Sequence, residues 1–64
     1  MPAQWTAEII GEMHLLSVTG RELANRVGWN PGYLSMVLNG HKEPKGAEKK
    51  LRDAIASIKA EREE

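Results

Sequence analysis

The sequence predicts an all-α domain. Apolar residues recur with helical spacing in four separate stretches, and Gly, Pro and Asn residues fall between these stretches. No segment alternates polar and apolar residues in the way a half-buried strand would.

The chain of 64 residues is predicted to form one domain, residues 1–64, with a small core. It contains no cysteine. Stability must therefore come from helix packing, with a dimer interface as a further source.

The first helix is expected to run from about Thr6 to Leu16. Thr6 is a suitable N-cap residue, and Glu8 in the first turn suits the positive end of the helix dipole. Ile9 and Met13 then continue at helical spacing toward Leu16.

The second helix is expected over about Gly20–Val27. Thr19 and Glu22 have the T-x-x-E spacing of a capping box, in which each side chain bonds the backbone N–H of the other residue. Gly28 follows the last apolar position and suits a left-handed C-cap.

The third helix is expected over about Pro31–Asn39. Asn30 is a good N-cap, and proline at the first helical position loses no hydrogen bond. Gly40 ends the helix. Both N-caps are flanked by apolar pairs with the spacing of a hydrophobic staple: Val18 with Leu23, and Trp29 with Leu34.

The fourth helix is expected from about residue 46 or 47 to Ala60, with frayed final residues. Its apolar stripe is Ala47, Leu51, Ala54, Ile55 and Ile58. The stripe first closes the core against the first helix. Ile58 is left open between this role and a dimer contact shared with Trp5 or Met1.

Composition excludes several classes of protein. No apolar run approaches the ~20 residues that span a bilayer, and no secretory signal precedes the first helix, so a cytoplasmic protein is expected. His14 and His41 lack zinc-site spacing, so no metal is expected. There is no paired-carboxylate site, nucleophile–base arrangement or phosphate-binding glycine loop. We therefore expect no enzyme, no cofactor and no small-molecule ligand.

The charge of the chain is balanced in total but not in distribution. Nine basic and nine acidic residues give a formal net charge of zero, which is unusual for a nucleic-acid-binding protein. Between Asn39 and Asp53, however, five basic residues stand against three acidic ones. A local basic patch is therefore compatible with a neutral chain.

The short connection between the second and third helices points to function. Gly28-Trp29-Asn30 is too short for a relaxed antiparallel helix hairpin, and a turn of this length containing glycine is typical of a helix-turn-helix unit. Ala24 is small, as a close helix crossing requires. In such a unit the second helix can enter the major groove of DNA. The same features also fit two packed helices of a generic bundle.

The segment Thr19–Gly40 resembles the helix-turn-helix of the phage repressor and Cro family, also called the XRE family. The features that match are Leu23-Ala24, Val27-Gly28, Leu34-Ser35, Leu38-Asn39-Gly40 and the loop His41-Lys42-Glu43-Pro44. The resemblance covers residues 6 to 60. It implies a lambda-repressor-like bundle of four or five helices and double-stranded operator DNA as the ligand. It also implies a transcriptional regulator of phage or mobile-element origin, usually a homodimer on a pseudopalindromic site.

The resemblance also assigns candidate DNA contacts. The base-reading candidates are Pro31, Gly32, Tyr33, Ser35 and Met36, and the backbone candidates are Arg21, Asn39, His41, Lys42 and Lys45, with Arg26 as a weaker one. Tyr33 and Met36 could instead pack partly into the core, and each lysine could be an ordinary solvated charge. Gly20 stands where the family usually has glutamine, and no Arg, Lys, Asn or Gln precedes Asn39 on the exposed face of the third helix.

A second interpretation fits the same fold. A protein-interaction module could keep the helix-turn-helix without binding DNA, and the zero net charge and weakly polar third helix favour it.

Overall fold

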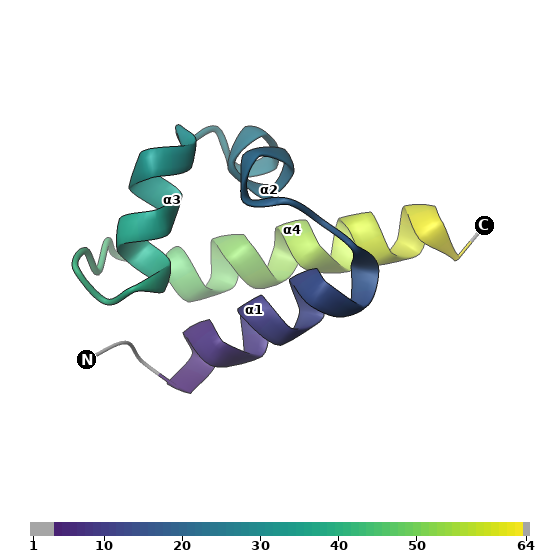
Figure 1. Ribbon diagram of the computed structural model, residues 1–64, viewed down its shortest axis with the longest axis horizontal. Helices are drawn as coiled ribbons and strands as arrows, with labels where there is room; N and C mark the ends of the chain where they lie inside the picture. Colours follow the sequence, from purple (N-terminus) through teal and green to yellow (C-terminus); the bar gives the residue numbers. More distant parts are fainter. Residues whose placement is uncertain (1–3, 64) are drawn as a thin grey trace.

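The computed structural model describes residues 4–63, which form four α-helices and contain no β-strand. These are α1 (Gln4–Leu16), α2 (Gly20–Val27), α3 (Pro31–Leu38) and α4 (Ala47–Arg62). The predicted all-α class is confirmed. In Figure 1, α1 and α4 run side by side in the same direction, while α2 is seen end-on and α3 lies across the view. The short α2 and α3 therefore cross steeply above the two longer helices.

The prediction that Thr6 caps the first helix is wrong. Helix α1 begins at Gln4, and Thr6 lies within it with only 2% of its surface exposed. Thr6 stands three residues before Ile9, so it extends the buried stripe of α1 by one turn. The helix therefore begins earlier than the capping preference of Thr6 suggests.

Three consecutive helices end with the same backbone hydrogen-bond pattern. After α1, the N–H of Val18 donates to the carbonyl of Met13 at 2.9 Å, and that of Ser17 donates to His14 at 3.2 Å. This pair of bonds defines a Schellman motif, which requires a left-handed residue after the helix. Equivalent bonds follow α2 and α3, where the left-handed residues are Gly28 (φ 80°) and Gly40 (φ 82°).

The starts of α2 and α3 are capped as the sequence predicts, with one difference. Thr19 Oγ1 accepts a hydrogen bond from the N–H of Glu22 at 3.1 Å, and Asn30 Oδ1 accepts from the N–H of Tyr33 at 2.7 Å. The carboxylate of Glu22 pairs with Arg62 rather than closing the capping box. The cap of α2 is thus tied to the end of α4.

One core joins all four helices. Its largest fully buried side chains are Ile9, Leu23, Leu34, Val37, Leu51 and Ile58. Ala24 is completely buried, which agrees with its predicted place at the crossing of α2 and α3. Ile58 is 1% exposed within a single chain, so it belongs to the core. Trp5 packs against this core, and Met1, its suggested partner in a dimer contact, lies outside the described residues.

The ends of α3 and α4 differ slightly from the predicted bounds. Asn39 is the C-cap of α3 rather than its last residue, which is within the usual uncertainty of a helix end. Helix α4 continues past Ala60 to Arg62, because Glu61 and Arg62 form ion pairs with α2. None of the described helices has the length and apolar character that a membrane span needs.

Ser17 is the only described non-glycine residue with a positive φ, at 56°. An L-residue in this region is less stable by about 1–2 kcal/mol, whereas glycine adopts it freely. We expect Ser17→Gly to raise the free energy of unfolding by about 1 kcal/mol, as measured by denaturant titration. Ser17→Ala keeps a Cβ at the same φ and serves as the control. Equal effects of the two substitutions would contradict the assignment of strain to this residue.

Candidate nucleic-acid interface

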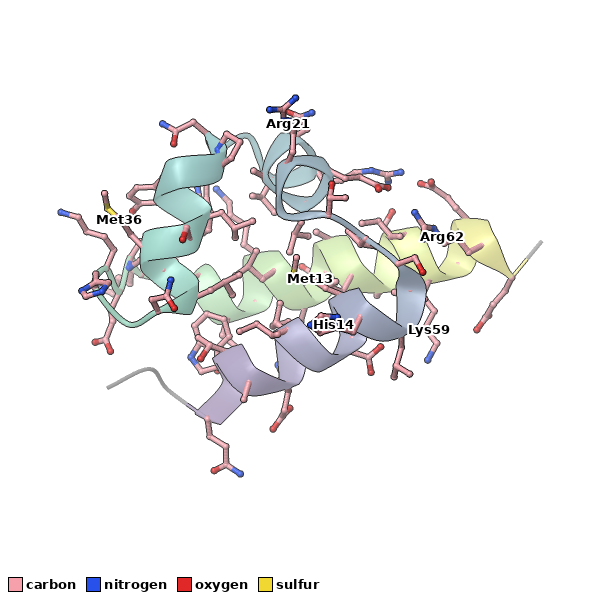
Figure 2. All side chains as sticks on the ribbon, in the orientation of Figure 1. Met13, His14, Arg21, Met36, Lys59 and Arg62 are labelled. Atoms are coloured by element: carbon pink, nitrogen blue, oxygen red, sulfur yellow. The ribbon has the colours of Figure 1, made fainter. Side chains whose placement is uncertain are left out.

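The outward face of α3 is formed by residues at helical spacing. Gly32, Ser35, Met36 and Asn39 are all exposed, while Leu34 and Val37 on the opposite side are buried. Pro31, at the start of the helix, is also exposed. Figure 2 shows Met36 projecting from α3 away from the other helices, and 45% of this residue is exposed. The face therefore offers small and apolar groups, with few polar atoms.

The polar atoms of this face belong to one bonded pair. Asn39 Nδ2 donates to the backbone carbonyl of Ser35 at 2.8 Å and to its Oγ at 3.2 Å. Because a carbonyl oxygen can only accept, the amide nitrogen must face Ser35 and Asn39 Oδ1 must face away. The pair leaves one acceptor, Asn39 Oδ1, and the hydroxyl hydrogen of Ser35 for another molecule.

Tyr33 lies at the edge of this face rather than on it. It is half-buried, packs against the core, and meets Trp29 edge-to-face with ring centroids 5.1 Å apart. Partial core packing, one of the two predicted roles of Tyr33, is therefore what the structure shows. Lys50 Nζ also approaches Trp29 and lies 5.9 Å from its ring centroid, near the outer limit of a cation–π contact.

Sequence reasoning did not single out Lys50. Its position on α4 lies beside the buried stripe, three residues after Ala47 and four before Ala54. That spacing directs the side chain along the edge of the core, toward α2 and α3, and could have identified it.

Exposed cations without an acidic partner surround α3. They are Arg21 in the first turn of α2, Lys42 and Lys45 in the loop after α3, and Lys50 on α4; none of them forms an ion pair within residues 4–63. Figure 2 shows Arg21 at the top of the view, projecting from α2 away from α1 and α4. No aspartate or glutamate occurs from residue 23 to residue 42. The loop after α3 has one acidic residue, the exposed Glu43 between Lys42 and Lys45, so the unpaired cations around α3 outnumber it.

The loop after α3 is fixed by its backbone. The N–H groups of His41 and Lys42 both donate to the carbonyl of Met36, at 2.8 and 3.3 Å. Both side chains are exposed. The loop therefore offers its side chains, and not these two backbone groups, to a ligand.

Other cations are held by acidic residues. Arg26 bonds both carboxylate oxygens of Glu61 at 2.5 and 2.6 Å, and Arg62 pairs with Glu22. The hydrogen bonds and charge of Arg26 lower the pKa of Glu61, and Glu61 in turn raises that of Arg26. Arg26, the weaker candidate from the sequence, is thus occupied in bracing α2 against α4.

Arg52 and Lys49 are also paired, the first with Glu8 and Glu48 and the second with Asp53. No group of three or more side chains suited to a metal ion occurs among the described residues.

Comparison with known proteins gives no further assignment. No protein-family model matches the chain, and no curated protein or solved structure matches it significantly.

The Arg26–Glu61 pair predicts a specific loss of stability in acid. Because the pKa of Glu61 is lower in the folded state than its ordinary 4.5, the contribution of the pair is present above that value and is lost as pH falls through the folded pKa. We expect the Glu61→Gln variant to melt at a lower temperature than the wild type at about pH 6. At about pH 3 the two melting temperatures should be nearly equal. The loss is small, because the pair is exposed to solvent.

Glu63→Gln is the matched control, because Glu63 is on the same end of α4 and forms no ion pair in the described chain. A Glu61→Gln effect of the same size at both pH values would contradict this account.

Proposed function

We propose that this protein binds double-stranded DNA, with α3 in the major groove. The observation that carries the proposal is the group of four cations around α3, Arg21, Lys42, Lys45 and Lys50, that lack acidic partners; Arg26, Lys49, Arg52 and Arg62 are paired, and Lys59 elsewhere on α4 is not. Unpaired Lys and Arg side chains bind phosphates and release counterions, which supplies much of the affinity of DNA-binding proteins. A surface that contacts only solvent would gain nothing from a group of unpaired cations.

The shape of α3 supports the same function. A major groove about 12 Å wide admits one helix, and the small side chains at Gly32 and Ser35 allow close approach. Lys50 beside Trp29, just before α3, and Lys42 and Lys45 in the loop after α3 suit phosphates that flank the helix at its two ends, and Arg21 on α2 adds a further cation. The steep crossing of α2 and α3 suits a helix-turn-helix.

Base recognition in this proposal rests on few groups. Met36 can contact the methyl group of thymine, and the Ser35–Asn39 pair offers a hydroxyl hydrogen and an acceptor to base edges. Pro31 and Gly32 place the start of the helix against the DNA, where sequence-dependent shape adds specificity. His41 supplements the phosphate contacts.

The resemblance of Thr19–Gly40 to the phage repressor and Cro family extends the proposal. It supports a sequence-specific transcriptional regulator of a phage or mobile element, with a cytoplasmic place of action. The alternative is a protein-interaction module with the same fold, which the net charge of zero and the exposed Met36 favour.

Selection of bound sequences from a random duplex pool separates the two functions. A DNA-binding regulator enriches a consensus sequence, which has half-sites about 10 bp apart if two copies bind side by side. Failure to bind any duplex at low salt and micromolar protein would overturn the DNA-binding proposal and leave the interaction module.

Two neighbouring lysines on α4 provide a matched test. Lys50 is unpaired and lies beside Trp29, whereas Lys49 is held by Asp53 at 2.9 Å. We expect Lys50→Ala to weaken binding to all duplexes and to reduce the slope of log K against log salt by about 0.9, the value for one lost phosphate contact. Lys49→Ala should leave that slope unchanged. Fluorescence anisotropy at several salt concentrations measures both, and equal slopes for the two variants would remove Lys50 from the interface.

A further inference from the structure

The sulfur chemistry of this chain is confined to methionine. The sequence contains three methionines and no cysteine. A thioether is converted to a sulfoxide by two-electron oxidants such as hydrogen peroxide, and reductases specific for methionine sulfoxide reverse the reaction. Because no thiol competes for such an oxidant, the exposure of each thioether decides where the chain reacts. Met1 lies outside the described residues, so the structure compares Met13 and Met36.

The two described methionines have opposite surroundings. Met13 is half-buried in α1 and packs against the core. Met36 is 45% exposed and is not among the side chains that pack against the core. Figure 2 shows Met36 projecting from α3 away from the other helices. An oxidant in solution therefore reaches Met36 Sδ more easily than Met13 Sδ.

Two other large apolar side chains of the described chain are exposed, Ile10 and Leu15, both on α1. Leu15 stands at the edge of a groove between α1 and α4, with acidic residues on the α1 edge and basic residues on the α4 edge. The groove is lined by Glu8, Ile9, Gly11, Glu12, Leu15, Arg52, Ile55, Ala56 and Lys59. Ile10 and Leu15 are hydrocarbons and offer an oxidant no heteroatom. Within residues 4–63, Met36 is thus the exposed apolar side chain that an oxidant can make polar.

The backbone around Met36 does not depend on its side chain. Its carbonyl accepts hydrogen bonds from the N–H groups of His41 at 2.8 Å and Lys42 at 3.3 Å, which fixes the loop after α3. Leu34 and Val37, on the opposite side of α3, provide the contacts with the core. An oxygen added to Met36 Sδ therefore changes the outward face of α3 and leaves the core intact.

The outward face of α3 is sensitive to such a change. Met36 is its largest apolar side chain, and in the proposed complex it contacts the methyl group of thymine. A sulfoxide carries a polar oxygen that accepts hydrogen bonds. A methyl group donates none, so the oxygen would be covered without a partner, which lowers affinity. The acceptor that the face already has, Asn39 Oδ1, cannot donate to it either.

We infer that Met36 is a site of reversible oxidation by peroxides, and that its sulfoxide weakens the binding of DNA. The lone pair of Met36 Sδ attacks one peroxide oxygen, the O–O bond breaks and the S–O bond forms. The proton on the transferred oxygen passes to the other oxygen, which leaves as water or, from an alkyl hydroperoxide, as an alcohol. Sulfur loses two electrons and the peroxide gains them. The effect on DNA rests on the proposed function, whereas the selective oxidation of Met36 does not.

Peptide mapping by mass spectrometry tests the modification site. The folded full chain is treated with hydrogen peroxide, and the sulfoxide at each methionine is followed with time. We expect Met36 to react several times faster than Met13. In denaturant the two rates should become similar, because burial no longer protects Met13. Equal rates in the folded protein would overturn the assignment of the site.

Fluorescence anisotropy with a selected duplex tests the effect on binding, each protein being compared with itself before and after peroxide. The dissociation constant of the wild type should rise about tenfold and return after treatment with methionine sulfoxide reductase. Met13→Leu keeps Met36 and should show the same rise. Met36→Leu keeps an apolar side chain of similar size without sulfur, and its affinity should not change on treatment. Circular dichroism checks that each treated protein is folded.

The possible outcomes separate this inference from the proposed function. Unchanged binding by wild type that is oxidised at Met36, or an equal loss in Met36→Leu, would overturn the effect on DNA. If the untreated wild type bound no duplex, the proposed function would fail and the effect on DNA with it. The oxidation rates would then still decide whether Met36 is the modification site.

Discussion

Gly28 holds the backbone conformation on which the arrangement of the other parts depends. At a φ of 80° it ends α2, and the N–H of Trp29 donates to the carbonyl of Ala24 at 2.9 Å. This tight reversal leaves only Asn30 before α3 begins, so the direction of α3 is set within three residues. The close crossing that results requires the small Ala24 at its centre, and it turns the outward face of α3 away from the core.

The ion pairs between α2 and α4 explain how a neutral chain keeps a positive surface. Two ion pairs connect α2 to the C-terminal end of α4: Arg26 with Glu61, and Glu22 with Arg62. These pairs neutralise cations that lie away from α3, and they use acidic residues at a distance from it. The residues from 23 to 42 contain no acid, and Glu43 is the one acidic residue in the loop that carries Lys42 and Lys45. The net charge of zero is thus a sum over ion-paired residues and the unpaired residues around α3. It therefore does not describe the charge of the surface around α3.

Features governed by local geometry could be predicted from the sequence. The caps at Thr19 and Asn30, the left-handed Gly28 and the buried stripe of α4 each depend on residues within a few positions of one another. The errors arose where distant contacts decide: Thr6 is drawn into the core, and the end of α4 is extended by ion pairs with α2. For the same reason the candidate site could be predicted only in part. The family resemblance named Ser35 and Met36 as candidates by their position in the motif, but Lys50 and the ion pair of Arg26 depend on neighbours more than 20 residues away.

The groove between α1 and α4 and the outward face of α3 differ in polarity and charge. The first is an apolar hollow with charges of opposite sign on its two edges. The second has no acidic residue within it and exposed cations around it, as the proposed binding of DNA requires. Helix α4 serves both, because Lys50 and Lys59 lie on different turns and sides of it, toward Trp29 and toward the groove. Because both surfaces include residues of this one helix, α4 fixes the position of one surface relative to the other.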